Sequence, residues 1–181
     1  TLFCQPGDLL DIRPNATTGA FDPQSWVTFK KLSGPSAIAA NELVAARYST
    51  TAQQSLTTGL NAIVDYDTVD VDTHGTVTTG GSWKFTAPVA GLYSVSALCA
   101  FTANVTGNRE LYVFKNGAGF TVLGAAQGAA TPTYLNGSAL IRMIPGDYID
   151  IRAYQASGGA LTLNPSASLT DMAVNVYRVG F

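Results

Sequence analysis

Residues 80–101 read GGSWKFTAPVAGLYSVSALCAF, and this stretch decides the fold because it contains two strands and the corner between them. Trp83 and Phe85 alternate with polar neighbours such as Lys84, which is the period of two expected of a strand with one buried face. Pro88 ends the first strand, because proline donates no hydrogen bond to a β-ladder. The next strand again places apolar side chains on one face, and these are Tyr93, Val95, Ala97, Cys99 and Phe101. The pattern predicts the core of a β-sandwich.

The run F-T-A-P-x-x-G-x-Y-x-V at residues 85–95 resembles the signature of the jelly-roll family that includes the globular heads of complement subcomponent q and tumour necrosis factor. The resemblance covers residues 43–181, although TDMAV at 170–174 departs from the family's usual Ser-x-Phe-x-Gly pattern. It implies an all-β fold, an antiparallel jelly-roll sandwich, and a compact homotrimer. Further landmarks of the family are Tyr66, Asp67, Leu111, Val113, Asn116, Gly117, Gly137, Ser138, Leu140, Gly146 and Asp147.

The first strand of the head is expected soon after residue 43. Residues 61–71 shift their apolar phase in mid-run, which indicates a bulge or a corner. Residues 110–115 are apolar on both faces and end in the turn Asn116-Gly117, so they predict a covered strand followed by a tight turn.

The later part of the head contains weaker patterns. A short strand is predicted near Phe120, and the alanine- and glycine-rich residues 125–137 predict a loop or a weak edge. Residues 139–144 and 147–155 are predicted to form a strand pair across the Pro145-Gly146 turn, and residues 173–179 to close the sandwich.

Composition limits the kinds of partner. Charged residues make up 12% of the 181 residues, and the formal net charge is −2, whereas about 25% charged residues is typical. So few charges favour a surface that other subunits or protein partners cover in part. The charge provides no basic patch for nucleic acid or anionic lipid, and no apolar run reaches the ~18 residues of a membrane span. We therefore expect neither a nucleic-acid nor a membrane partner.

The two cysteines, Cys4 and Cys99, do not make a disulfide framework. Cys99 falls on the inward phase of its strand, where a thiol behaves as a small hydrophobic group. Both are interpreted as reduced, which indicates assembly in a reducing cytoplasm.

Residues 1–42 are predicted to form an extended N-terminal arm rather than a second domain. Proline-containing turns cut this segment into short pieces, which are too few to bury a core of their own. Its large apolar side chains are therefore expected to attach the chain to another protein or to a neighbouring copy, and they are Phe3, Leu9, Phe21, Trp26 and Phe29.

One face of the strand at residues 147–155 has the composition of an interface. With Ile149, Ile151 and Ala153 pointing inward, the alternation sends four side chains to the other side, and these are Tyr148, Asp150, Arg152 and Tyr154. Tyrosine and arginine are favoured at protein interfaces, so we interpret this face as a candidate subunit or partner surface. An ordinary ladder of half-exposed cross-strand pairs is the alternative.

Residues that could carry catalysis are few. His74 is the only histidine, which excludes a site with several histidine ligands, and no nucleophile-elbow or phosphate-binding glycine motif is present. The acidic residues of 65–72 could hold calcium, but their spacing differs from that of an EF-hand loop and also suits a solvated strand edge. We expect no enzyme activity, no cofactor and no metal.

These observations together predict a structural protein of a virion, assembled in the host cytoplasm. The specific hypothesis is a homotrimeric capsid decoration or cement protein whose arm binds the major capsid protein or another virion protein and whose head faces outward. The first alternative is a receptor-binding knob of a phage fibre or tail, which would bind a host-surface receptor. The second is a secreted trimeric signalling or recognition ligand.

Overall fold

The described part of the head consists of strands without helices. The computed structural model describes residues 43–50, 52–164 and 172–180. Within these ranges the thirteen strands are β1 (Ala45–Thr50), β2 (Gln54–Leu56), β3 (Ala62–Ile63), β4 (Thr68–Asp72), β5 (Val77–Thr78), β6 (Lys84–Thr86), β7 (Gly91–Phe101), β8 (Asn108–Lys115), β9 (Ala118–Gln127), β10 (Thr133–Met143), β11 (Tyr148–Gln155), β12 (Leu161–Leu163) and β13 (Met172–Gly180).

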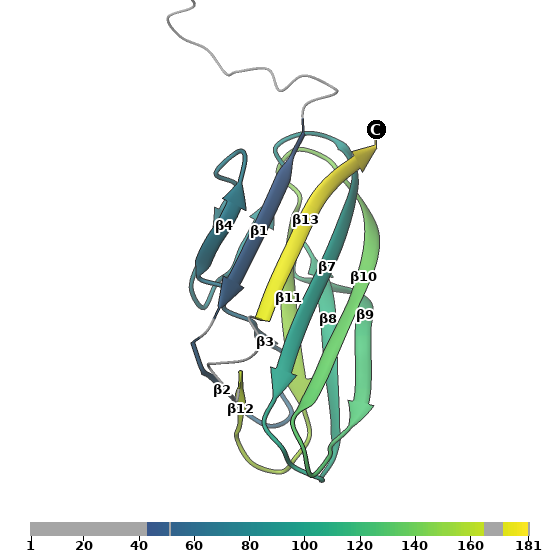
Figure 1. The fold of residues 1–181 in the computed structure, drawn as a ribbon. Coiled ribbons are helices and arrows are strands. Elements are labelled where there is room, and N and C mark those ends of the chain that lie inside the picture. The colour runs from purple at the N-terminus through teal and green to yellow at the C-terminus, as the bar shows by residue number, and fades with distance from the viewer. Residues whose placement is uncertain (1–42, 51, 165–171, 181) are drawn as a thin grey trace, which may run out of the picture. The chain divides into compact units, whose positions relative to one another are not determined.

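The strands form two antiparallel sheets that face each other. Sheet A has the order β2-β12-β7-β13-β1-β4, and β10 also pairs with β7. Sheet B has the order β5-β6-β11-β8-β9, and β3 also pairs with β11. Figure 1 shows β4, β1, β13, β7 and β10 side by side in front, with the strands of sheet B behind them. The prediction of an all-β antiparallel sandwich is confirmed.

The stretch at residues 80–101 folds as its pattern predicts. Trp83 and Phe85 have no exposed surface, while Lys84 between them is half-buried on the outer side. In β7 the five predicted inward side chains are buried, including Tyr93, Val95 and Cys99 at 0% exposure. Burial raises the pKa of the Cys99 thiol, which therefore remains protonated and acts as an apolar group. Cys99 is free, as predicted.

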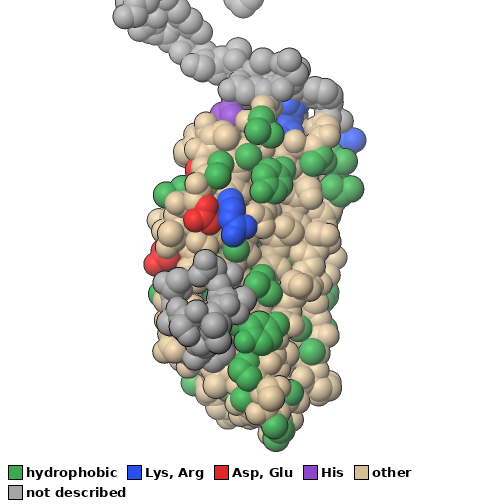
Figure 2. Space-filling model, in the orientation of Figure 1, with side chains coloured by type: hydrophobic (Ala, Val, Ile, Leu, Met, Phe, Trp, Pro, Cys, Tyr) green, Lys and Arg blue, Asp and Glu red, His purple; other side chains and the backbone are tan. Residues whose placement is uncertain are grey.

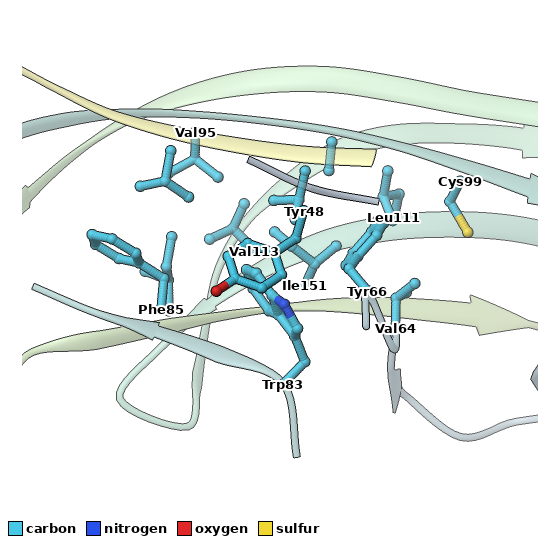
Figure 3. Close-up of a cluster of buried hydrophobic side chains, with 14 of the residues drawn as sticks. Tyr48, Val64, Tyr66, Trp83, Phe85, Val95, Cys99, Leu111, Val113 and Ile151 are labelled. Atoms are coloured by element: carbon cyan, nitrogen blue, oxygen red, sulfur yellow. The ribbon is translucent and has the colours of Figure 1, made fainter. Parts of the chain in front are cut away.

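The core forms where the two sheets meet, around three large rings. The ring of Trp83 packs edge-on against those of Tyr48 and Tyr66, with centroid distances of 6.3 and 5.6 Å. Figure 3 shows these rings between the strands, with Leu111, Val113 and Ile151 close by. Such a cluster contributes mainly through apolar area removed from water.

The predicted change of phase at residues 61–71 corresponds to a corner. β3 pairs with β11 in sheet B, whereas β4 pairs with β1 in sheet A, so the chain passes from one sheet to the other between them. The β1–β4 register also shifts between Arg47 and Tyr48. The predicted corner is therefore present, although the shifted apolar residues Val69 and Val71 do not point inward, since they are 58% and 46% exposed on β4.

The prediction of a loop or weak edge at residues 125–137 is correct only in part, because β9 and β10 lie at the edges of their sheets but most of this range belongs to the two strands. β9 extends to Gln127 and β10 begins at Thr133, so residues 128–132 alone connect them. Asn136-Gly137, which resembles a turn, lies in the middle of β10. The physical reason is close packing, because a Cβ at Gly137 would lie 2.1 Å from the carbonyl oxygen of Leu123 in β9. Glycine here serves the close approach of two main chains.

The predicted strand pair across Pro145-Gly146 is wrong. β10 pairs with β7 along its whole length, whereas β11 pairs with β8, β6 and β3. The turn between them carries the chain from sheet A to sheet B. It leaves the outer faces of β10 and β11 on opposite sides of the sandwich, which provides two separate candidate surfaces.

Candidate functional site

The outer face of sheet A carries exposed apolar side chains on two strands that flank β7. Tyr134 and Leu140 on β10 are 51% and 59% exposed, and Tyr177 and Val179 on β13 are 40% and 55% exposed. Figure 2 views this face and shows few charged side chains on it. Tyr134 lies opposite Ala100 of β7, whereas Leu140 and Tyr177 both lie opposite Ser94, so these apolar side chains form separate groups on the face. Exposed aromatic and aliphatic side chains among few charges are typical of a protein contact.

A hollow lies in the middle of the same face. Across it runs a row of polar side chains in which Nη1 of Arg47 donates to Oδ1 of Asn175 at 3.0 Å, and Nδ2 of Asn175 donates to Oγ of Ser96 at 3.3 Å. Nε of Arg47 also pairs with Asp70 at 3.1 Å. The hollow encloses about 460 Å³ and is lined by Arg47, Ser96, Ala97, Leu98, Asn136, Gly137, Ser138, Ala173 and Asn175. Most of these side chains are small, so the surface can accept a protruding side chain.

The second surface is the outer face of sheet B, where the predicted residues of β11 lie. Tyr148, Arg152 and Tyr154 are half-buried on this face, opposite the buried Ile149 and Ile151. The predicted alternation therefore matches the structure. Whether this face binds a subunit or a partner remains a hypothesis.

Asp150 differs from its neighbours on that face, because it is only 2% exposed. Its two carboxylate oxygens accept hydrogen bonds from Nε of Arg152 at 2.6 Å and from Nη2 at 3.2 Å. The hydrogen bonds that Arg152 donates to Asp150 raise the pKa of Arg152, so the guanidinium stays charged at every pH of interest. The guanidinium also lies over the ring of Phe114, 3.9 Å from its centroid.

Sequence reasoning missed three side chains that complete this face. Tyr112 and Phe114 come from β8, and their rings meet edge-on at 6.2 Å. Lys84 comes from β6, and its Nζ lies 5.2 Å from the centroid of Tyr148. The available signal was that residues 110–115 are apolar on both faces, since a strand with solvent on one side would show polar residues there.

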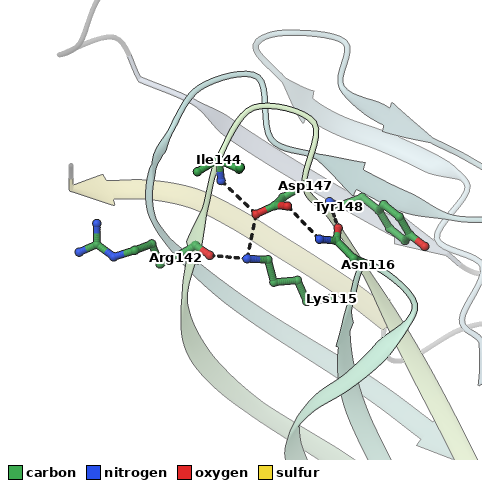
Figure 4. A network of polar contacts seen from close by, with 6 residues as sticks. All are labelled: Lys115, Asn116, Arg142, Ile144, Asp147 and Tyr148. Carbon is green, nitrogen blue, oxygen red and sulfur yellow. Dashed lines mark hydrogen bonds and ion pairs between the residues drawn. The ribbon is translucent and has the colours of Figure 1, made fainter.

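A network of polar contacts joins the two turns that follow β8 and β10 (Figure 4). Asp147 pairs with Nζ of Lys115 at 2.8 Å and accepts hydrogen bonds from Nδ2 of Asn116 and from the backbone N–H of Ile144. Asn116 in turn accepts from the backbone N–H of Tyr148. The hydrogen bonds from Lys115, Asn116 and Ile144 lower the pKa of Asp147 to about 2. This network fixes the turns and leaves little capacity for a ligand.

The acidic residues of 65–72 bind separate partners. Asp72 accepts from the hydroxyl of Tyr48 and from the backbone N–H groups of His74, Thr76 and Val77, the last of which begins β5. Burial and this hydrogen bond raise the pKa of Tyr48 to about 12. Burial, and then the charge of Asp67, raise the pKa of Asp65. Across the described ranges, no group of three or more His, Cys, Asp or Glu side chains is arranged to hold a metal ion.

The predicted attachment residues Phe3, Leu9, Phe21, Trp26 and Phe29 lie outside the described residues, as does Cys4. Their role in attachment remains a prediction. None of the described residues forms a helix of the length and hydrophobicity that crossing a membrane requires.

Comparison with solved structures defines the class of fold. The chain is similar to Eiger, a TNF from S. frugiperda, with 12% identity and a TM-score of 0.56 over 76% of this chain and 93% of that one. It is similar to the globular domain of zebrafish complement 1qA, with 11% identity and a TM-score of 0.52 over 75% and 97%. Murine APRIL gives 14% identity and a TM-score of 0.56 over 76% and 100%. The head therefore has the TNF and C1q jelly-roll fold, as the sequence resemblance implied.

Sequence relatives come from a virus and a phage-like element. The chain is 32% identical over 110 residues to the uncharacterized protein L688 of Acanthamoeba polyphaga mimivirus, and 28% identical over 147 residues to the phage-like element PBSX protein XkdV of Bacillus subtilis strain 168. These matches cover 57% and 76% of this chain. The chain spans only 47% of the first relative and 20% of the second. No family model matches the chain.

Proposed function

We propose that the chain is a non-enzymatic structural protein of a virus or bacteriophage particle, with the jelly-roll head displayed on a trimer and the arm bound to a capsid or other virion protein. The observation that carries the proposal is the head's fold in a chain whose sequence relatives belong to a virus and a phage-like element. Decoration or cementing of the capsid is the role we favour.

The outer face of sheet A supports self-association. A closed trimer uses a heterologous interface, in which one patch of each subunit meets a different patch of the next. The hollow around Ser96 and Asn175, with the exposed Leu140 and Tyr177 beside it, is suited to receive side chains of a neighbour. Burial of these apolar side chains would contribute about 1.5–3 kcal/mol each if complete.

Copy number per particle tests the role. The full chain would be localised and counted on purified particles by quantitative mass spectrometry and by labelling in electron microscopy. Hundreds of copies spread over the shell are expected of a decoration protein. A few copies at a vertex or tail tip would contradict that role and would favour a receptor-binding knob, while absence from particles would contradict the whole proposal.

A trimer is tested separately by light scattering. The full chain is expected to run at about three times the chain mass of 18.9 kDa. A chain that remains at one mass at micromolar concentration would contradict the trimer, and the apolar face of sheet A would then need another partner.

A further inference from the structure

Arg152 on the outer face of β11 has a fixed orientation and unused hydrogen-bonding capacity. Nε and one N–H of Nη2 donate to Asp150. Within the described part of the chain, both N–H groups of Nη1 and the second N–H of Nη2 have no acceptor. The ring of Phe114 supports the plane of the guanidinium from one side. The arginine therefore presents a fork of donors that needs little further ordering to bind.

The ion pair that orients Arg152 is a poor way to stabilise a sandwich. Asp150 is nearly inaccessible although it lies on the outer side of sheet B. The free energy needed to remove such a charge from water is about as large as the free energy gained from the ion pair. A well-packed apolar pair in the same place is often at least as stabilising. A role in holding the guanidinium for a ligand accounts for this buried pair better than a role in stability does.

We propose that the outer face of β11 and β8 is a binding site for a protein partner, with the free fork of Arg152 receiving one carboxylate side chain of that partner. The two oxygens of a carboxylate match the planar Nη1 and Nη2 donors in a bidentate contact. This inference does not rest on the trimer, because the outer face of sheet A lies on the other side of the sandwich.

The surroundings of Arg152 favour a single carboxylate over a polyanion. Lys84 adds one positive charge near Tyr148, but Asp150 and the half-buried Glu110 on β8 oppose it. Glu110 accepts a hydrogen bond from Asn108. It lies opposite Tyr154, which is the next cross-strand pair on this face after Tyr112 and Arg152. Charges that nearly balance would not attract a phosphate chain or a nucleic acid.

The aromatic side chains favour a protein as the source of the carboxylate. Tyr112 faces Arg152 directly across the β8–β11 ladder, and Tyr148 and Tyr154 lie on the same face of β11. The centre of a protein interface is typically rich in tyrosine and arginine, and its charged groups are few or are paired with one another. The outer face of β11 and β8 has this composition.

The test uses the full chain and a capped peptide, acetyl-Gly-Glu-Gly-amide, as the probe. The ring resonances of Tyr112 and Phe114 would be followed by NMR during titration, and a saturable shift is expected with this peptide but not with its Gln counterpart. Arg152→Lys keeps the charge but loses the fork, so it is expected to weaken binding about tenfold. Arg142→Lys, which makes the same exchange at an exposed arginine of β10 on sheet A, is the matched control and should leave binding unchanged.

A second variant distinguishes the loss of the carboxylate contact from a change of fold. Phe114→Leu keeps a packed apolar side chain but removes the ring beneath the guanidinium, and it should weaken binding in the same direction as Arg152→Lys. Three results would overturn the proposal: no saturable shift, an equal shift with the Gln peptide, or tighter binding of glucuronic acid, which would indicate an acidic saccharide instead. A loss of assembly mass in Arg152→Lys would also overturn it, because the face would then be a subunit contact.

Discussion

Gly137→Ala is expected to destabilise the head, because β9 and β10 leave no room for a methyl group between their main chains. The new Cβ would lie 2.1 Å from the carbonyl oxygen of Leu123 and 2.8 Å from its carbonyl carbon, whereas ordinary contact lies at 3.4–4 Å. Both atoms belong to the backbone, so no side chain can rotate away. Overpacking of this kind typically costs about 1–3 kcal/mol, and we expect about 2–3 kcal/mol here.

Urea unfolding measured by the fluorescence of Trp83 checks this value. Trp83 is fully buried, and a Trp26→Phe background makes it the single reporter, since the chain has two tryptophans. Gly119→Ala is the matched control in the neighbouring strand, because its Cβ would meet nothing closer than Phe114 at 3.8 Å. If Gly137→Ala and Gly119→Ala unfold within about 0.5 kcal/mol of each other, the close approach of β9 and β10 is not what requires glycine.

Three further changes have expected outcomes. The pKa of Asp147 is lowered to about 2, so this carboxylate stabilises the fold fully above its unfolded pKa of 3.8, and the contribution is lost as the pH falls through about 2. Asp147→Asn should therefore remove this part of the stability decrease from an acid-unfolding curve, and an unchanged curve would contradict the network. Arg109 is fully buried and donates to three backbone carbonyls, so Arg109→Met should lower stability in urea by about 1–3 kcal/mol, whereas an unchanged midpoint would exclude this role. Leu140→Asp should reduce the mass in light scattering from three chains to one. Trp26→Ala should leave that mass intact while weakening retention on particles. The reverse pattern would assign the arm to assembly and the head to attachment.

The sequence predicts strands well where side-chain alternation and burial coincide. In β7, one face is buried in the core and the other is half-buried, so the period of two is visible in the residues themselves. The corner at residues 61–71 is visible as a change of apolar phase between the buried Val64 and Tyr66 and the exposed Val69 and Val71. In both cases the information is local to the strand.

The sequence fails where a residue's role depends on another part of the chain. Gly124 of β9 and Gly137 of β10 resemble loop residues. A Cβ at either position would instead meet the main chain of the other strand, at 3.3 Å from Asn136 and at 2.1 Å from Leu123 respectively. Pro145-Gly146 has the chemistry of a hairpin turn, but a turn that pairs two strands and a turn that carries the chain to the other sheet use the same residues. The choice between them is made by the pairing of β10 with β7 and of β11 with β8.

The same reasoning explains how much of the β11 face could be predicted. Alternation placed Tyr148, Asp150, Arg152 and Tyr154 on one face, but it could not reveal that Asp150 is buried or that Arg152 lies on Phe114. The pattern Asp-Ile-Arg occurs twice, at residues 11–13 and at 150–152, so it cannot mark a site by itself. At residues 150–152 the β8–β11 register places Tyr112 opposite Arg152 and Phe114 opposite Asp150. The register therefore converts a repeated local pattern into an arginine with one fixed orientation, which is the property that binding a carboxylate requires.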